Sequence, residues 1–239
     1  MLQTAQYTHI GGRSCNEDSV RQCDRGGNLC IVVADGLGGH GGGDRASEAV
    51  CRTVCEGFDG SVDPERLGQL LQDAHGAVTA MQTPQCAMKS TAVVLAVGGG
   101  RSAWAHVGDS RLYHFHSGVR VFQTRDHSAS QIAVMMGEIT TDQIRFHEDR
   151  SRILRALGQE DALKVETGEE SLAPGSHAYL LCSDGFWEYV QEEEMEEDLR
   201  LATDSEDWLA RMRRRIDERA AADHDNHTAA AVWLTYEKE

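Results

Sequence analysis

The 239-residue chain has little of several features, and each shortage excludes a class of protein. It has three prolines, no Ser-rich stretch and no repeat of fixed period, so nothing marks a linker between domains. No apolar run reaches the roughly 18 residues of a membrane span, and the start MLQTAQYTHIGG lacks the basic and apolar regions of a secretion signal. We therefore expect one domain, residues 1–239, in the cytoplasm and away from membranes.

Positive charge is also scarce. The chain has 23 Lys and Arg against 39 Asp and Glu, a formal net charge of −16. Binding to a nucleic-acid backbone needs a basic face, so a nucleic-acid partner is excluded. Phosphorylated substrates are not, because a bound divalent metal can dominate the local electric field.

The seven cysteines contain no C-x-x-C pair. Cys30 and Cys182 lie in apolar strands and are typical of small core residues. Cys51 and Cys55 are one helical turn apart, a spacing that could hold a soft metal, but their inward-facing positions favour packing in the core. Such cysteines fit a reducing compartment.

The most informative stretch is LCIVVADGLGGHGGGDRASEAV, residues 29–50. Its apolar run, 29–34, predicts a buried strand that ends at Asp35 and continues into a glycine-rich loop. A helix over about 44–57 follows, with Asp44 as its expected N-cap. A carboxylate at a strand end, beside backbone without side chains, suits a hard cation and a phosphate oxygen.

The rest of the chain predicts mixed helices and strands. A hairpin joins 20–24 to 29–34, a helix begins at Asp63-Pro64, and short antiparallel strands follow Ser90. We expect a strand pair at 163–170 and 177–183. Further expectations are a strand at 3–10, a helix that carries the acidic run 192–198, a helix at 205–222, and a last strand at 228–236. We interpret the acidic run 192–198 and the basic cluster 211–215 as solvated helix faces rather than docking sites.

Acidic residues recur at the ends of the predicted apolar strands. Asp35, Asp109 and Asp184 each follow such a strand, and Asp225 precedes the last one. A single strand-end aspartate is an ordinary turn former, but several at neighbouring ends would repel one another if left unneutralised. Oxygen ligands without a Cys/His set indicate Mg²⁺ or Mn²⁺, and two such ions sharing a carboxylate activate water for hydrolysis.

These residues resemble the metal-dependent protein phosphatase 2C family of serine/threonine phosphatases. The resemblance covers nearly the whole chain, and its motifs occur in the family's order. They are R-x-x-NED at 13–18, ADGLGGHGGG at 34–43, STAV at 90–93, GDSR at 108–111, DHS at 126–128, RALG at 155–158, SDG at 183–185 and DN at 225–226. Each motif alone is weak evidence for the family, whereas all of them in this order make a specific match.

The resemblance implies an α+β fold, a four-layer α-β-β-α sandwich of two antiparallel sheets flanked by helices. It implies a bacterial-type flap at about 129–157, a segment that also reads as an insertion laid over the sheet edge. The metal ligands would be Asp35 between two ions of Mn²⁺ or Mg²⁺, the carbonyl of Gly36, and Asp184 with Asp225. Asp109 would serve a third, looser site together with Asp184.

The resemblance also assigns catalytic roles. Arg13 would clamp the substrate phosphate, and Glu17 and Asp18 would hold metal-bound waters or contact an ion directly. A metal-bridging hydroxide would displace the serine or threonine oxygen in one step. Animal members carry a histidine after the Asp-Gly pair, where this chain has Leu37, so His40 either donates the proton or orders the glycine loop.

The implied partners are phosphoproteins that carry phosphoserine or phosphothreonine. A small stand-alone bacterial phosphatase of this kind usually opposes a Ser/Thr kinase and is expected to be a monomer. The segment SDGFWEYV resembles members associated with type VI secretion clusters.

Two other functions remain to be weighed. Gly36-x-Gly38-x-x-Gly41 satisfies the dinucleotide-binding fingerprint, which would make the protein an oxidoreductase, but hairpins rather than βα units follow it. Alternatively, a phosphatase fold without catalysis would bind phosphoproteins only. The retained Arg13, Asp35, Asp184 and Asp225 speak against that second alternative.

Overall fold

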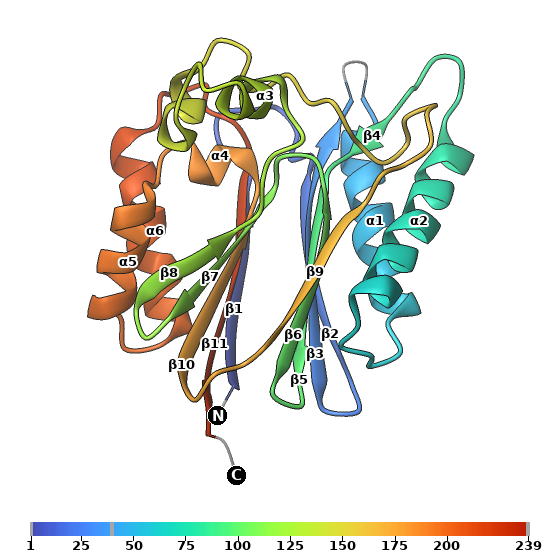
Figure 1. The fold of residues 1–239 in the computed structure, drawn as a ribbon. Helices are drawn as coiled ribbons and strands as arrows, with labels where there is room; N and C mark the ends of the chain where they lie inside the picture. The colour runs from blue at the N-terminus through green and yellow to red at the C-terminus, as the bar shows by residue number, and fades with distance from the viewer. Residues whose placement is uncertain (1, 39–40, 238–239) are drawn as a thin grey trace.

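Two antiparallel β-sheets pack face to face at the centre of the molecule, and helices cover both outer faces (Figure 1). This computed structural model describes residues 2–38 and 41–237. One sheet has the order β1-β11-β10-β7-β8, and its strands are Leu2–His9, His227–Tyr236, Gly175–Cys182, Arg111–His116 and Val119–Gln123. The predicted α-β-β-α sandwich is confirmed.

The second sheet has the order β2-β3-β5-β6-β9, with the short β4 paired to β3. Its strands are Asp18–Arg25, Asn28–Leu37, Ala92–Gly98, Arg101–Val107, Glu166–Ser171 and, for β4, Lys89–Ser90. The strand pairs of both sheets are antiparallel. A dinucleotide-binding domain needs parallel βαβ units, so that alternative is wrong.

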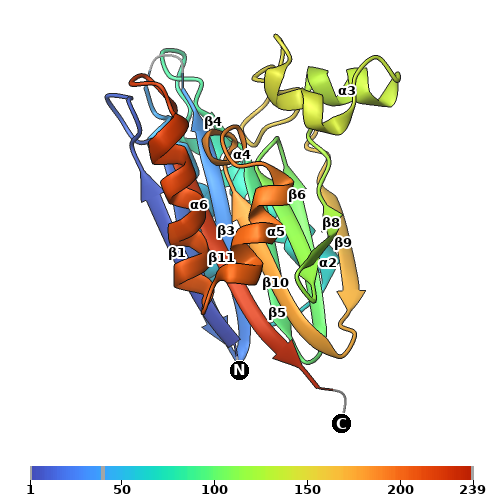
Figure 2. The ribbon, with the colours of Figure 1, turned by 90° about the vertical axis from the view of Figure 1, so that its left-hand side faces the viewer.

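Two long helices cover each sheet (Figure 1). The second sheet carries α1 (Gly43–Gly57) and α2 (Pro64–Met81), and the first carries α5 (Glu192–Leu201) and α6 (Ser205–Arg219). The shorter elements are α3 (Ala129–Met135), the 3₁₀ helix η1 (Thr141–Phe146) and α4 (Asp184–Trp187). Figure 2 shows the segment with α3 standing beyond the strand ends, above β8 and β9. None of the helices described is long and apolar enough to cross a membrane.

The apolar side chains fill three layers. In β3, Cys30, Val32 and Ala34 face α1 and α2, whereas Leu29, Ile31 and Val33 face the other sheet. A strand buried on both faces reads as a continuous apolar run, which explains the pattern at 29–34. Cys51 and Cys55 are buried in the layer under the helices, as the core interpretation predicts.

The β2–β3 hairpin places two acidic residues opposite each other. Its two-residue turn consists of Gly26 and Gly27, with φ of +64° and +81°, the left-handed geometry that matches the twist of paired strands. The resulting register pairs Asp18 with Asp35 at the far end of the hairpin. A local turn therefore brings two segments of the predicted site together.

Several local expectations are settled by the structure. Asp63 caps α2 as predicted, since its side chain accepts a hydrogen bond from the Arg66 N–H. The N-cap of α1, however, is Gly42 and not Asp44, because the chain enters that helix with a φ of +100° that suits glycine.

Two further expectations are wrong. The segments 163–170 and 177–183 do not pair, because β9 joins β6 in one sheet while β10 joins β7 and β11 in the other. The acidic and basic runs of α5 and α6 are not simply solvated. Arg215 bonds Glu194 and Asp198, so the two helices hold each other through ion pairs.

Gly36 provides a test of how tightly the end of β3 is packed. A Cβ there would lie 2.0 Å from the Gly43 carbonyl oxygen, so we expect Gly36→Ala to destabilise the fold by about 1–3 kcal/mol. At exposed Gly76 of α2 a Cβ meets nothing within 4 Å, and Gly76→Ala should stabilise by about 1 kcal/mol. Urea unfolding of both variants measures this, and equal effects would contradict the packing argument.

Candidate metal centre

A cavity of about 820 Å³ opens at one end of the sandwich, where strands of both sheets terminate. The predicted site residues that line it are Arg13, Glu17, Asp35, Gly36, Asp184 and Asp225. Ser151 and Ile153, from the expected flap segment, line it as well. The structure therefore brings distant parts of the chain to one place.

The backbone of Asp35 is fixed from both sides. Its N–H donates to the Thr91 hydroxyl at 3.0 Å, and its carbonyl accepts from the Thr91 N–H at 2.8 Å and from the Ser90 hydroxyl at 3.0 Å. These bonds hold the end of β3, and with it the Asp35 carboxylate, in one position.

The Asp35 carboxyl group is surrounded by other acids. Burial, followed by the charges of Asp18, Asp184, Asp109 and Asp225, holds its pKa well above the usual value. Asp184 begins α4 directly after β10, and its carboxyl lies within hydrogen-bonding reach of Asp35. Burial and the charges of Asp225 and Glu188 raise the pKa of Asp184 to about 6.

Asp18 lies behind Asp35 and is almost fully buried. It accepts a hydrogen bond of 2.6 Å from the Ser183 hydroxyl. Burial raises its pKa to about 7, and the nearby Asp184 and Asp225 add to the shift, against the hydrogen bonds from Ser183 and Thr228. The pKa of the Asp18 carboxyl group therefore lies near neutral pH.

Asp109, in the loop between β6 and β7, is 1% exposed, and neither carboxylate oxygen has a partner among the residues that the structure describes. Burial and the charge of Asp184 hold its pKa well above the usual value. Its carbonyl accepts from the Trp187 indole N–H at 2.9 Å. The Arg111 guanidinium lies 3.6 Å from the centre of that indole and pairs with Asp126 at 2.7 Å.

Arg13 and Asp225 meet at the rim of the cavity. The Arg13 guanidinium contacts the Asp225 carboxylate at 2.8 Å, and both side chains are about half exposed. Asn226 supports this rim, because its amide donates to the carbonyls of Ile10 and Cys15 and its oxygen accepts from the Glu17 N–H. The loop that carries Arg13 is therefore tied to the start of β11.

Glu17 faces the start of α1. Burial raises the pKa of its carboxyl group, against a hydrogen bond from the Gly43 N–H. The partial positive charge at the N-terminus of the helix also acts against this rise. His40, the candidate proton donor, lies outside the described residues, and Leu37 lines the cavity.

The donor set fits divalent cations of the hard type. Asp109 keeps two buried oxygens without protein partners, and the carboxyl groups of Asp35 and Asp184 approach each other closely. Buried polar atoms normally find partners, and carboxylates held together normally need a counter-charge. Oxygen-only ligands are what Mg²⁺ and Mn²⁺ prefer.

The residues that hold this site in shape were not predicted from the sequence. Ser183, Asn226 and the buried Arg111–Asp126 pair all act through tertiary contacts. Each lies next to a predicted ligand or within a quoted motif, which was the only signal available. Neighbouring positions in sequence do not reveal which distant backbone group a side chain bonds.

A family model described as "Protein phosphatase 2C" matches residues 5–227. The serine/threonine protein phosphatase PstP of Mycobacterium tuberculosis is 32% identical over 195 residues, which cover 79% of this chain and 37% of that protein. The chain thus spans well under half the length of this relative. A crystal structure of PstP has a TM-score of 0.85 at 29% identity and covers 98% of this chain and 99% of its own.

Two further solved structures are similar to this chain. The catalytic domain of PstP, in complex with two manganese ions, has a TM-score of 0.83 at 25% identity, covering 98% of this chain and 99% of its own. PppA of Pseudomonas aeruginosa, a key regulatory component of the T6SS, has a TM-score of 0.76 at 27% identity, covering 97% and 96%.

The raised pKa values predict how the metal-free protein responds to pH. Asp184 (about 6) and Asp18 (about 7) bind protons in the folded state at pH values where an unfolded aspartate, with a pKa near 3.9, has lost them. Stability should therefore fall as pH rises from about 4 to 7. For Asp184 alone the shift corresponds to about 3 kcal/mol, or several degrees in Tm.

Thermal unfolding in EDTA at pH 5 and pH 7.5 measures this fall. Mn²⁺ should reduce it, since the cation favours the charged carboxylates. Asp109→Asn removes a carboxyl group with a raised pKa at constant size and should also reduce the fall in stability. A metal-free protein equally stable at both pH values would contradict the crowding of carboxylates described above.

Proposed function

Because the chain belongs to the protein phosphatase 2C family, we propose that it hydrolyses phosphoserine and phosphothreonine on proteins in a reaction that depends on Mn²⁺ or Mg²⁺. The observation that carries the proposal is the gathering of Asp35, Asp184 and Asp225 around one cavity with Arg13 at its rim, while the buried Asp109 lies near enough to raise the pKa of Asp35. This arrangement combines carboxylates that can bind cations with a guanidinium group that can bind a phosphate.

We assign the roles of the site as follows. Asp35 would be shared by two divalent cations, the Gly36 carbonyl would help to hold one of them, and Asp184 with Asp225 would hold the other. Asp109 would hold a third cation together with Asp184, and its two unpartnered oxygens would then be ligands of that cation. When bound, such ions lower the pKa of a coordinated water and neutralise the charge of a phosphate ester.

Arg13 is the group that binds and orients the substrate phosphate. Its guanidinium is half exposed and rests on Asp225, from which it can reach into the cavity. A planar guanidinium donates two parallel hydrogen bonds to phosphate oxygens, which a lysine cannot do. His40 remains our candidate for giving a proton to the leaving serine or threonine oxygen.

The biological setting is a further proposal. We propose that the protein opposes a bacterial Ser/Thr kinase in the cytoplasm, as a monomer, and acts in the control of type VI secretion. The similarity to PppA supports the secretion role, and seven free cysteines fit a reducing compartment. Loss of the gene should then raise the phosphorylation of secretion components, which phosphoproteomics of the native host measures.

The alternative is a protein that binds phosphoproteins without cleaving them. Hydrolysis of para-nitrophenyl phosphate and of phosphopeptides, with Mn²⁺ and with EDTA, separates the two. Metal-dependent release of phosphate from pSer and pThr peptides, and little from pTyr, supports the proposal. Tight binding of the same peptides without turnover under any metal would favour the alternative.

We predict that Asp35→Asn lowers kcat by more than the roughly 10–100-fold that changing a residue behind a metal ligand costs, because it weakens two ions at once. Calorimetric titration with Mn²⁺ should show weaker binding in parallel. Asp73→Asn, on the exposed face of α2, is the matched control and should retain both. Near-normal rates for Asp35→Asn would refute its place between the ions.

We predict that Arg13→Lys lowers kcat/KM by about 10–100-fold, the value of a charge-assisted hydrogen bond, mainly through KM. Steady-state kinetics with a phosphothreonine peptide measures the split. Arg66→Lys, at a surface pair with Asp59, is the control. A fall in kcat at constant KM would assign Arg13 to the chemical step instead of phosphate binding.

A further inference from the structure

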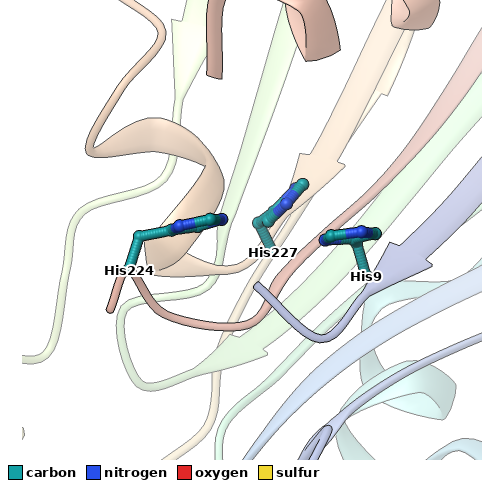
Figure 3. Close-up of side chains that lie close together, drawn as sticks. All are labelled: His9, His224 and His227. Carbon is teal, nitrogen blue, oxygen red and sulfur yellow. The ribbon is translucent and has the colours of Figure 1, made fainter. Parts of the chain in front are cut away.

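Three histidines lie together beside the acidic cavity. His9 ends β1, His227 begins β11, and His224 lies in the turn before it. Figure 3 shows the rings in a row, with His227 between the other two. One ring nitrogen from each lies within 4.8 Å of the others, and the ring centres of His9 and His224 are 4.8 and 5.5 Å from that of His227.

His227 offers a free nitrogen at the centre of this group. It is fully buried, and its Nδ1 lies 3.1 Å from the Tyr7 hydroxyl, while its Nε2 has no partner among the described residues. With the proton on Nδ1, shared with Tyr7, Nε2 keeps a lone pair that can bind an ion.

His224 has the same arrangement. Its Nδ1–H donates to the Ala221 carbonyl at 2.6 Å, which leaves the lone pair on Nε2. A hydrogen bond from the second ring nitrogen to a backbone carbonyl or an oxygen is typical of histidines that bind metals, since it fixes the tautomer and the ring. Two of the three rings are therefore prepared to act as ligands.

His9 differs in its hydrogen bond. Its Nδ1 accepts the Gly11 N–H at 3.0 Å, which places the proton of the neutral ring on Nε2. To bind an ion, His9 has to exchange that backbone bond for the metal. It is consequently the weakest of the three ligands, and its removal should lower the affinity for the ion least.

We propose that His9, His224 and His227 form a second cation site, separate from the acidic centre, for a divalent transition metal such as Zn²⁺, Ni²⁺ or Cu²⁺. Imidazole suits these borderline ions, whereas carboxylates suit Mg²⁺ and Mn²⁺. Zinc–nitrogen bonds of about 2.0–2.1 Å require the rings to close slightly around the ion. The site is independent of the proposed phosphatase activity.

The position of the site defines what the ion would do. The Gly12 N–H donates to the His224 carbonyl at 2.9 Å, so the loop that leads to Arg13 rests on the turn that carries His224. An ion held by the three histidines ties the end of β1 to the start of β11 beneath that loop. The Arg213 guanidinium, 5.3 Å from the Tyr7 ring, opposes the added charge and limits the affinity.

Zn²⁺ titration in the presence of excess Mg²⁺, with a competing chromogenic chelator, tests the proposal on the full chain. We expect the wild type to bind one Zn²⁺ that His224→Ala binds at least about 10-fold more weakly. His9→Ala should lose less Zn²⁺ affinity than His224→Ala. His147→Ala is the matched control for His9, since its Nδ1 also accepts the N–H two residues on, from Asp149 at 3.1 Å.

Two further measurements keep the result decisive if replacing buried His227 prevents folding. Tyr7→Phe removes only the hydroxyl that orients His227, and it should weaken Zn²⁺ about 10-fold or more while leaving Mn²⁺ binding unchanged. Co²⁺ bound to the wild type should show the visible absorption of nitrogen ligation, and His224→Ala should not. Equal Zn²⁺ affinity in all variants, or a parallel loss of Mn²⁺ affinity, would overturn the proposal.

Discussion

The structure depends on one unfavourable interaction, the crowding of buried carboxyl groups at one end of the sandwich. Asp18, Asp35, Asp109 and Asp184 each have a raised pKa, and burial is the largest cause in every case. Each unit of such a shift is about 1.4 kcal/mol of interaction that disfavours the charged form. Divalent cations favour the charged form of these carboxyl groups and so reverse this preference. Relief of the repulsion present in the metal-free protein therefore adds to its affinity for metal.

The two-sheet core supplies the rigidity that such crowding requires. The acids of the site lie in strands or next to them: Asp18 begins β2, and Asp35 lies inside β3, which runs on to Leu37 and does not end at Asp35 as the sequence predicts. Neighbouring strands fix this backbone, and polar side chains fix the rest. Thr91 holds Asp35, Ser183 holds Asp18, and Asn226 holds the loop at Arg13. Carboxylates on mobile loops would move apart to relieve their repulsion, whereas carboxylates at strand ends cannot.

The sequence predicts the ligands better than it predicts their supports. An apolar run that ends at an acid identifies Asp35 and Asp184 without any tertiary information, and the Gly26-Gly27 turn sets the register that brings Asp18 opposite Asp35. The partners of β9 and β10 could not be predicted, because alternation defines a strand and not the sheet that receives it. The α1 cap was misjudged because Gly42 enters the helix with a conformation that residue type alone leaves open.

The buried arginines show how the expected flap segment is joined to the metal centre. Arg111 pairs with Asp126, stacks on Trp187 and lies 3.6 Å from Glu192, and Trp187 in turn bonds the carbonyl of Asp109. Arg145 of η1 contacts the same Glu192 and the Trp187 carbonyl. Removing one partner of a buried ion pair leaves an uncompensated charge, so the loss of one of these contacts destabilises the others. The segment above the strands and Asp109, the most buried acid of the site, are consequently parts of one packed unit.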